Sequence, residues 1–179
     1  RIERIIRDIP SNLVVEGPTK FSNLRQLVNR TMIQAKSVCH CIRCREVKDQ
    51  SRREKIILFR EDHEASPGQE VFLSFEDKNR QRLYGLLRLR LPKAAEVGPP
   101  PLFPALQGAA LIREIHTYGP SLPFSIRQKN SPQHRGLGKR LMTEAEKIAQ
   151  KNGFERMAVI AGVGVRDYYR KLGYRLQDT

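Results

Sequence analysis

The chain has 179 residues, and its 33 lysines and arginines against 19 aspartates and glutamates give a net charge of +14. Hydrophobic residues make up 39% of the sequence, enough for a packed core, which excludes wholesale disorder. No apolar stretch approaches the roughly 18 residues of a membrane span. The charge favours a polyanionic partner, nucleic acid first, and we expect a cytoplasmic fragment of a longer protein with no membrane partner.

The beginning of the chain predicts a basic lead-in followed by one helix. Arginines stand among isoleucines at Arg1, Arg4 and Arg7. A helix is predicted over 23–36, with a cap at residue 22 or 23, because apolar residues recur there at helical spacing: Leu24, Leu27, Val28 and Met32.

All three cysteines, Cys39, Cys41 and Cys44, fall within six residues, which does not suit a disulfide framework. Their spacing brings three thiolates within reach of one metal ion, and tetrahedral zinc needs a fourth ligand. The candidates for that ligand are His40, His63, His116 or a group outside the chain. The alternative is three free thiols.

From residue 55 the pattern changes to β-strands, predicted at 55–62, 70–77 and 82–91 with polar hairpin loops between them. A proline-containing loop is expected over 93–107, and a long connection precedes Gln133. The remaining elements are expected in the order strand 109–119, helix 138–152, strand 156–161, helix 165–172 and a last strand opening at Tyr174. This order predicts a mixed α/β domain with a mostly antiparallel sheet.

A glycine-rich turn opens the amphipathic helix predicted at 138–152. One face of this helix is apolar and is formed by Leu141, Ala145, Ile148 and Ala149. The run Gln-x-x-Gly-x-Gly allows a close backbone approach, and free N–H groups at a helix start bind a diphosphate. Basic side chains next to the turn add positive charge. By itself, the pattern also fits a plain strand-to-helix turn. The predicted cofactor-binding residues here are Gln133, Gly136, Leu137, Gly138, Lys139 and Arg140.

The closing run Tyr169-Arg-Lys-Leu-Gly-Tyr174, behind the glycine turn, resembles the GNAT acetyltransferase superfamily. The resemblance implies a fold that binds the pantetheine of acetyl-CoA between two splayed parallel strands. A tyrosine hydroxyl near the coenzyme sulfur can protonate the leaving thiolate. Tyr169 matches that acid and Tyr168 is the second candidate; the alternative is that both are packed aromatic residues.

The strand before the glycine turn carries alternating Glu114, His116 and Tyr118, which therefore share one face. The superfamily resemblance implies that the main chain of this strand pairs with pantetheine and that Glu114 is the catalytic base. An ion pair between Arg113 and Glu114, or a satisfied core His116, is an equally economical interpretation. The implied contacts to the cofactor on this strand are Glu114, Ile115, His116 and Thr117.

Successive blocks of the chain resemble, in order, the acetyltransferase half of Elongator catalytic subunits of the prokaryotic type. These blocks are RIIRDIP, NLRQL, CIRCREV, FLSFED, LLRLRLP, REIHTYG, QHRGLGKRLMTEAEKIA and VIAGVGVRDYYRKLGYRL. That family joins this domain to a radical S-adenosylmethionine domain and modifies the wobble uridine of tRNA with acetyl-CoA as donor. Bound tRNA is proposed to trigger acetyl-CoA hydrolysis. The iron–sulfur cysteines of the radical domain are absent here, while the cysteine cluster resembles the family's zinc-bearing linker.

The resemblance therefore implies a basic, helical zinc-bearing linker over 1–54 and a GNAT domain over 55–179 whose last strand is cut short. The partners implied are acetyl-CoA, tRNA and the radical domain of the same protein, and a homodimer is left open. The expected tRNA-binding residues are Arg1, Arg4, Arg7, Arg43 and Arg45. Two other functions stay open: a protein-lysine acetyltransferase, and a non-catalytic zinc-braced tRNA-binding module.

Overall fold

The computed structural model describes residues 2–3, 12, 15–16, 23–48, 55–65, 67–93, 103–119 and 136–177. The chain divides into two compact units, Arg1–Glu46 and Val47–Thr179. The elements are α1 (Leu24–Gln34), α2 (Ile42–Arg45), β1 (Ile57–Glu64), β2 (Gly68–Glu76), β3 (Leu83–Pro92), η2 (Pro104–Leu106), β4 (Ala109–Thr117), α3 (Leu137–Lys151), β5 (Arg156–Val159), η4 (Val163–Val165) and α4 (Arg166–Lys171).

The first unit holds α1 and α2. The helix predicted over 23–36 is confirmed as α1, and its apolar stripe is half-buried rather than fully buried. Asn23 precedes the helix without a side-chain capping bond. The short α2 begins directly after Cys41, and the main-chain N–H groups of Ile42 and Arg43 donate to the carbonyls of Ile2 and Glu3. Main-chain hydrogen bonds therefore join the segment that holds the cysteine cluster to residues 2 and 3.

The second unit is built on one five-stranded sheet in the order β1-β2-β3-β4-β5. The first four strands pair antiparallel, and β4 pairs parallel with β5. The central strands β2 and β3 are buried along most of their length, in keeping with their runs of leucine, valine and phenylalanine. The mixed, mostly antiparallel α/β domain expected from the sequence is confirmed.

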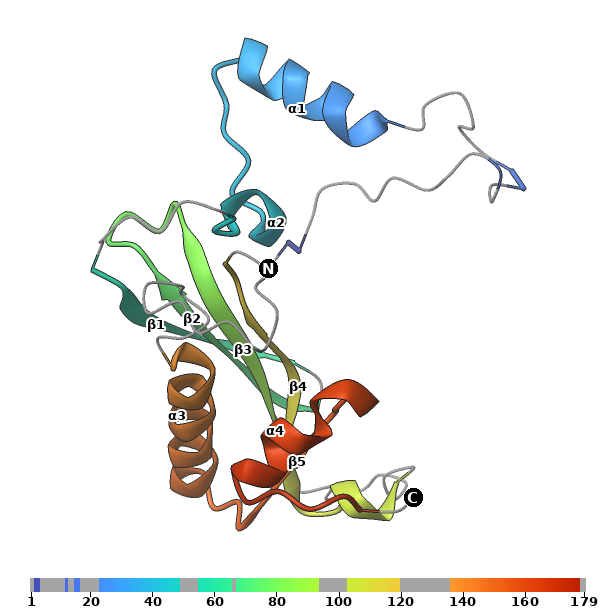
Figure 1. The fold of residues 1–179 in the computed structure, drawn as a ribbon, viewed down its shortest axis with the longest axis vertical. Coiled ribbons are helices and arrows are strands. Elements are labelled where there is room, and N and C mark those ends of the chain that lie inside the picture. Colours follow the sequence, from blue (N-terminus) through green and yellow to red (C-terminus); the bar gives the residue numbers. More distant parts are fainter. Residues whose placement is uncertain are drawn as a thin grey trace. The chain divides into compact units, whose positions relative to one another are not determined.

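Helix α3 lies along one face of this sheet (Figure 1). Its predicted apolar face is confirmed, because Leu141, Ala145, Ile148 and Ala149 are all buried. They share one core cluster with the sheet residues Phe75, Leu87 and Ile112. This packing fixes the start of α3 against the sheet, close to the end of β4.

The last strand expected at Tyr174 is wrong for the described residues, since 174–177 form no strand. The N–H of Tyr174 donates to the carbonyl of Tyr169, and the left-handed Gly173 (φ +94°) closes the end of α4. This is a Schellman-type ending, which uses the N–H group that a strand would need. The long connection before α3, with Gln133, lies outside the described residues.

Among the helices that the structure describes, none is long and apolar enough to cross a membrane.

Replacing Leu141 by alanine tests the contact between α3 and the sheet. The side chain is fully buried, so the cavity left behind should lower the free energy of unfolding by about 2–5 kcal/mol. Lys147→Ala, at an exposed position of the same helix, should change stability by less than about 0.5 kcal/mol. Equal stability of the two variants in urea titration would contradict this packing.

Candidate functional site

The parallel strands β4 and β5 part halfway along β4. Their last pair is Ile112 with Val159, and the N–H of Ile160 donates to the carbonyl of Ile112 at 3.2 Å. Beyond this point β4 continues to Thr117, while the chain after β5 turns away into η4. Within the described residues, 113–117 therefore has a strand neighbour on one side only. Splayed strands, the feature expected for this fold, are present.

A β-bulge determines toward which face of the sheet each side chain of β4 points. The register between β3 and β4 shifts between Arg88 and Leu89. After the shift, Ile115 packs against the core cluster beneath α3, while Glu114 and His116 lie on the other face of the sheet. Thr117 is on the α3 face, because its methyl carbon lies 3.7 Å from the Cβ position of Gly138.

The predicted glycine turn is present at the start of α3. Gly136 adopts φ +66°, a left-handed conformation that favours glycine, and the N–H of Arg140 donates to its carbonyl at 3.0 Å. Helix geometry leaves the three preceding amides, those of Leu137, Gly138 and Lys139, without an intrahelical acceptor. Lys139 is exposed, and the Arg140 guanidinium lies 4.6 Å above the Phe75 ring. The turn is thus equipped to bind an anion.

The two tyrosines of α4 take different positions. The hydroxyl of Tyr168 lies 3.0 Å from the Cβ position of Gly138, so this side chain covers the start of α3. Tyr169 is only 8% exposed and packs edge-on against Tyr168, with ring centroids 5.2 Å apart. Burial raises the pKa of both phenols, so each is a protonated donor at neutral pH.

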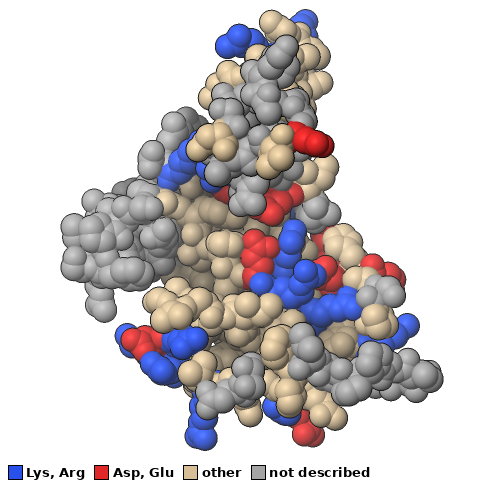
Figure 2. All heavy atoms as spheres, turned by 90° about the vertical axis from the view of Figure 1, so that its right-hand side faces the viewer, with Lys and Arg blue, Asp and Glu red and all other residues tan. Residues whose placement is uncertain are grey.

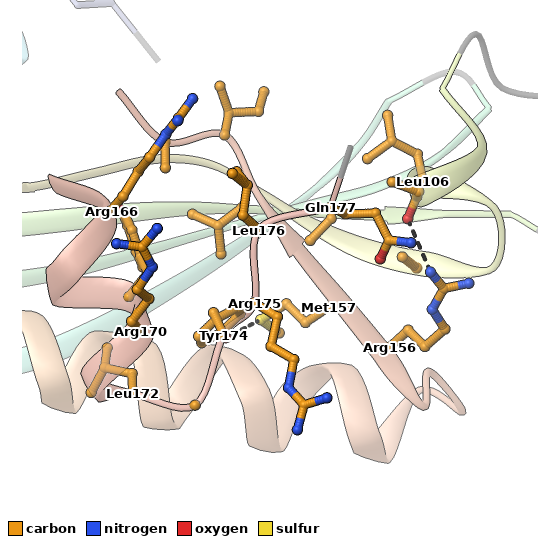
Figure 3. A pocket seen from close by; sticks show the side chains of 18 of the residues that line it. Leu106, Arg156, Met157, Arg166, Arg170, Leu172, Tyr174, Arg175, Leu176 and Gln177 are labelled. Carbon is orange, nitrogen blue, oxygen red and sulfur yellow. Dashed lines mark hydrogen bonds between the residues drawn. The ribbon is translucent and has the colours of Figure 1, made fainter. Parts of the chain in front are cut away.

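A cavity of about 920 Å³ lies beside β5 and α4, on the side of the C-terminal residues. Arg166 and Arg170 lie on one side of it and Arg156 on the other (Figure 3). The Tyr174 hydroxyl donates to Glu146 at 2.8 Å and lies 3.3 Å from the sulfur of Met157. Tyr169 also lines this cavity, whereas Tyr168 does not.

Glu114, the expected base, is held by two neighbours. One carboxylate oxygen lies 3.3 Å from Nη1 of Arg88, and the other lies 3.2 Å from Nε2 of His116. Arg113 instead pairs with Glu70 at 2.7 Å, so the Arg113–Glu114 pair is not formed. The His116 side chain is 55% exposed and is no core histidine.

Sequence reasoning missed Arg88. The alternation of leucine and arginine along β3 was the signal that could have found it, because it places Arg88 on the same sheet face as Glu114, its register partner.

The cysteine cluster is assembled in the structure. The sulfur atoms of Cys39, Cys41 and Cys44 all lie within 4.8 Å of one another, a spacing compatible with three ligands of one metal ion. Burial raises the pKa of the Cys39 thiol to about 11, and the two neighbouring thiols act in the same direction. His40 does not join this cluster in the described part of the chain, and His63 and His116 belong to the other unit.

Of the arginines expected to bind tRNA, the structure describes two. Arg43 is exposed and pairs with Glu46 at 2.6 Å, whereas Arg45 is buried, with 6% exposed. Arg1, Arg4 and Arg7 lie outside the described residues. Seen from the side away from α3, basic and acidic side chains lie next to one another rather than in patches of one sign (Figure 2).

Comparison with known proteins agrees with this architecture. Residues 128–174 match the model of the acetyltransferase (GNAT) family, which covers the glycine turn, α3, β5 and α4. This stretch of the chain is therefore similar in sequence to GNAT acetyltransferases, in agreement with the splayed strands and the glycine turn.

Proteins similar to this chain include a tRNA uridine(34) acetyltransferase and Elongator complex proteins. The chain is 42% identical to a tRNA uridine(34) acetyltransferase of Dehalococcoides mccartyi over 98% of its length, and 43% identical to Elongator complex protein 3 of Homo sapiens over 99%. It is also similar to the solved archaeal Elp3 of Methanocaldococcus infernus, with 39% identity, a TM-score of 0.66, 97% of this chain and 42% of that one covered. The chain spans 38% and 32% of the length of the two curated relatives.

The cysteine geometry predicts one bound metal ion per chain. Elemental analysis of protein prepared without chelators should find about one equivalent of zinc or iron, because three thiolates converge on one point. Cys44→Ser should lower the metal content and the thermal stability of the first unit, since structural metal binding contributes folding free energy. Protein free of both metals, with unchanged stability in Cys44→Ser, would contradict the assignment.

Proposed function

We propose that this chain is the acetyl-CoA-dependent acetyltransferase domain of an enzyme that modifies the wobble uridine of tRNA. The observation that carries the proposal is the meeting of three parts at one place: the opening between β4 and β5, the glycine turn of α3 and the paired tyrosines of α4. The name of the relative from Dehalococcoides mccartyi, tRNA uridine(34) acetyltransferase, supports tRNA as the acceptor.

Acetyl-CoA would bind both in the opening between β4 and β5 and at the glycine turn of α3. The free amides of Leu137, Gly138 and Lys139 suit the diphosphate, and the exposed Lys139 ammonium adds positive charge there. Among the described residues, no strand pairs with 114–117 on the β5 side, where amide groups of pantetheine can pair as a strand would. Gln133 and Arg140 are proposed as further contacts to the coenzyme.

A tyrosine of α4 would protonate the thiolate that leaves. We propose Tyr169 for this role on its place in the Tyr-x-x-x-Gly-Tyr run, with Tyr168 as the second candidate. Tyr168 is better placed to close over the diphosphate, because its hydroxyl already lies against Gly138. Burial raises the pKa of each phenol, so both hydroxyls carry a proton at neutral pH that can be donated.

The first unit would connect this domain to the rest of the enzyme. We propose zinc at Cys39, Cys41 and Cys44 as a structural ion, and a basic lead-in over 1–54 that contacts tRNA phosphates. In this proposal the partner domain is a radical S-adenosylmethionine domain with its iron–sulfur cluster, and the enzyme works in the cytoplasm, where its tRNA is found.

Coenzyme binding is tested at the two glycines of the turn. Gly136→Glu and Gly138→Glu should each abolish CoA binding in calorimetric titration, because both place bulk and a negative charge beside the diphosphate. Gln150→Glu, which adds the same charge near the exposed far end of α3, should bind CoA as the wild type does. Unchanged affinity in both glycine variants would refute this mode of binding.

Two sets of mutations should separate tRNA binding from acetyl-CoA hydrolysis. Replacing Arg4, Arg7 and Arg43 together by glutamate should weaken binding of many tRNAs about equally and reduce its salt dependence, since phosphate contacts release counterions. Tyr169→Phe should keep tRNA binding but slow tRNA-stimulated acetyl-CoA hydrolysis in the full-length enzyme. Filter binding at two salt concentrations and hydrolysis rates decide this; normal tRNA binding by the triple variant would place the surface elsewhere.

A further inference from the structure

Three side chains form a chain of contacts on the sheet face opposite α3. Arg88 of β3 pairs with one oxygen of Glu114, and Nε2 of His116 approaches the other at 3.2 Å. The imidazole is also stacked on Tyr118, with 6.0 Å between ring centroids and an interplanar angle of 16°. Two separate contacts thus hold the His116 ring in one orientation.

Exposure distinguishes the histidine from the carboxylate. Both oxygens of Glu114 are engaged and its side chain is 25% exposed, whereas the His116 side chain is 55% exposed. In the described part of the chain, no hydrogen bond or ion pair involves Nδ1 of His116. His116 therefore carries the basic atom that water can reach, and Glu114 is occupied in holding it.

Among the described residues, the edge of β4 beyond Ile112 carries an exposed side chain, His116, on this face. On the α3 side, Ile115 packs into the core and Thr117 lies against Gly138, so side chains fill that space. On the opposite side, His116 stands at the part of β4 that has lost its β5 neighbour. A thioester lying along this edge would have its carbonyl carbon open to water from the His116 side.

We propose that His116 is the catalytic base that activates water for acetyl-CoA hydrolysis, and that Glu114 and Arg88 are its positioning residues. The inference rests on the proposed acetyl-CoA site. Nδ1 takes one proton from water, the water oxygen bonds to the carbonyl carbon, and the carbon–sulfur bond breaks. A tyrosine hydroxyl of α4 gives its proton to the thiolate, so the products are acetate and CoA. The imidazolium passes its proton through solvent to the tyrosinate, which restores both groups, and the acetic acid formed releases its own proton to solvent as acetate.

The carboxylate has a defined part in this step. It selects the tautomer of His116 with its proton on Nε2, which leaves Nδ1 free to accept one, and it stabilises the imidazolium that forms. Arg88 contacts the other carboxylate oxygen and so holds the carboxylate toward His116. The Glu114 assignment as base, expected from the superfamily resemblance, is thereby replaced by a carboxylate–imidazole pair.

Chemical rescue with imidazole tests the proposal in the full-length enzyme with tRNA. His116→Ala should bind CoA normally by calorimetry but release CoA roughly 100-fold more slowly, the scale of a lost general base. Added imidazole should restore part of that rate. His63→Ala, at an exposed histidine on β1 at the far edge of the sheet, should be active and unaffected by imidazole.

Glu114→Gln distinguishes positioning from catalysis. It should lower kcat less than His116→Ala does and leave the KM for acetyl-CoA unchanged, while Glu114→Asp should recover part of the rate. A His116→Ala variant that hydrolyses normally, or that binds CoA but never responds to imidazole, would overturn the proposal. So would a larger loss in Glu114→Gln than in His116→Ala. Wild-type enzyme that neither binds nor hydrolyses acetyl-CoA would instead refute the proposed function itself.

Discussion

The parting of β4 from β5 is the constraint on which the rest of the site depends. A sheet buries its main chain by pairing each strand on both sides, and an unpaired N–H or C=O inside a protein is costly. Here, pairing stops at Ile112 and Val159, while β4 continues for five more residues to Thr117. Within the part of the chain that the structure describes, one edge of that stretch pairs with no strand, and a strand-like ligand could use its hydrogen-bonding groups.

The two faces of the sheet then serve different purposes. Helix α3 covers one face and presents the free amides of its first turn at the end of β4. The other face carries charged side chains in pairs, among them Arg88 with Glu114 and Arg113 with Glu70. The bulge after residue 112 links the two, because it sets which β4 side chains turn toward α3 and which toward the charged face.

Local patterns predicted most of this domain. The stripe Leu141, Ala145, Ile148 and Ala149 located α3, and β-rich runs between polar loops located β1 to β3. The strand expected at Tyr174 is absent because the end of α4 uses the N–H of Tyr174, which donates to the carbonyl of Tyr169 after the left-handed Gly173. A strand pattern in the sequence does not reveal this bond. The contacts of Glu114 were not predicted. The leucine–arginine alternation of β3 indicates the face on which Arg88 lies, but the bulge that brings Arg88 opposite Glu114, 26 positions away in sequence, leaves no sequence pattern.

The cysteine cluster has a consequence for the redox behaviour of the chain. Because the three sulfur atoms lie within 4.8 Å of one another, a thiol oxidised to a sulfenic acid would have a neighbouring thiol with which to condense to a disulfide, leaving the third unpaired. The raised pKa of Cys39 makes it a slow nucleophile at neutral pH, whereas Cys44 is exposed to oxidants. A metal ion held by all three thiolates would remove this reaction altogether. The oxidation rate of the cluster would then report its metal occupancy, and stripping the metal would turn a structural centre into a reactive one.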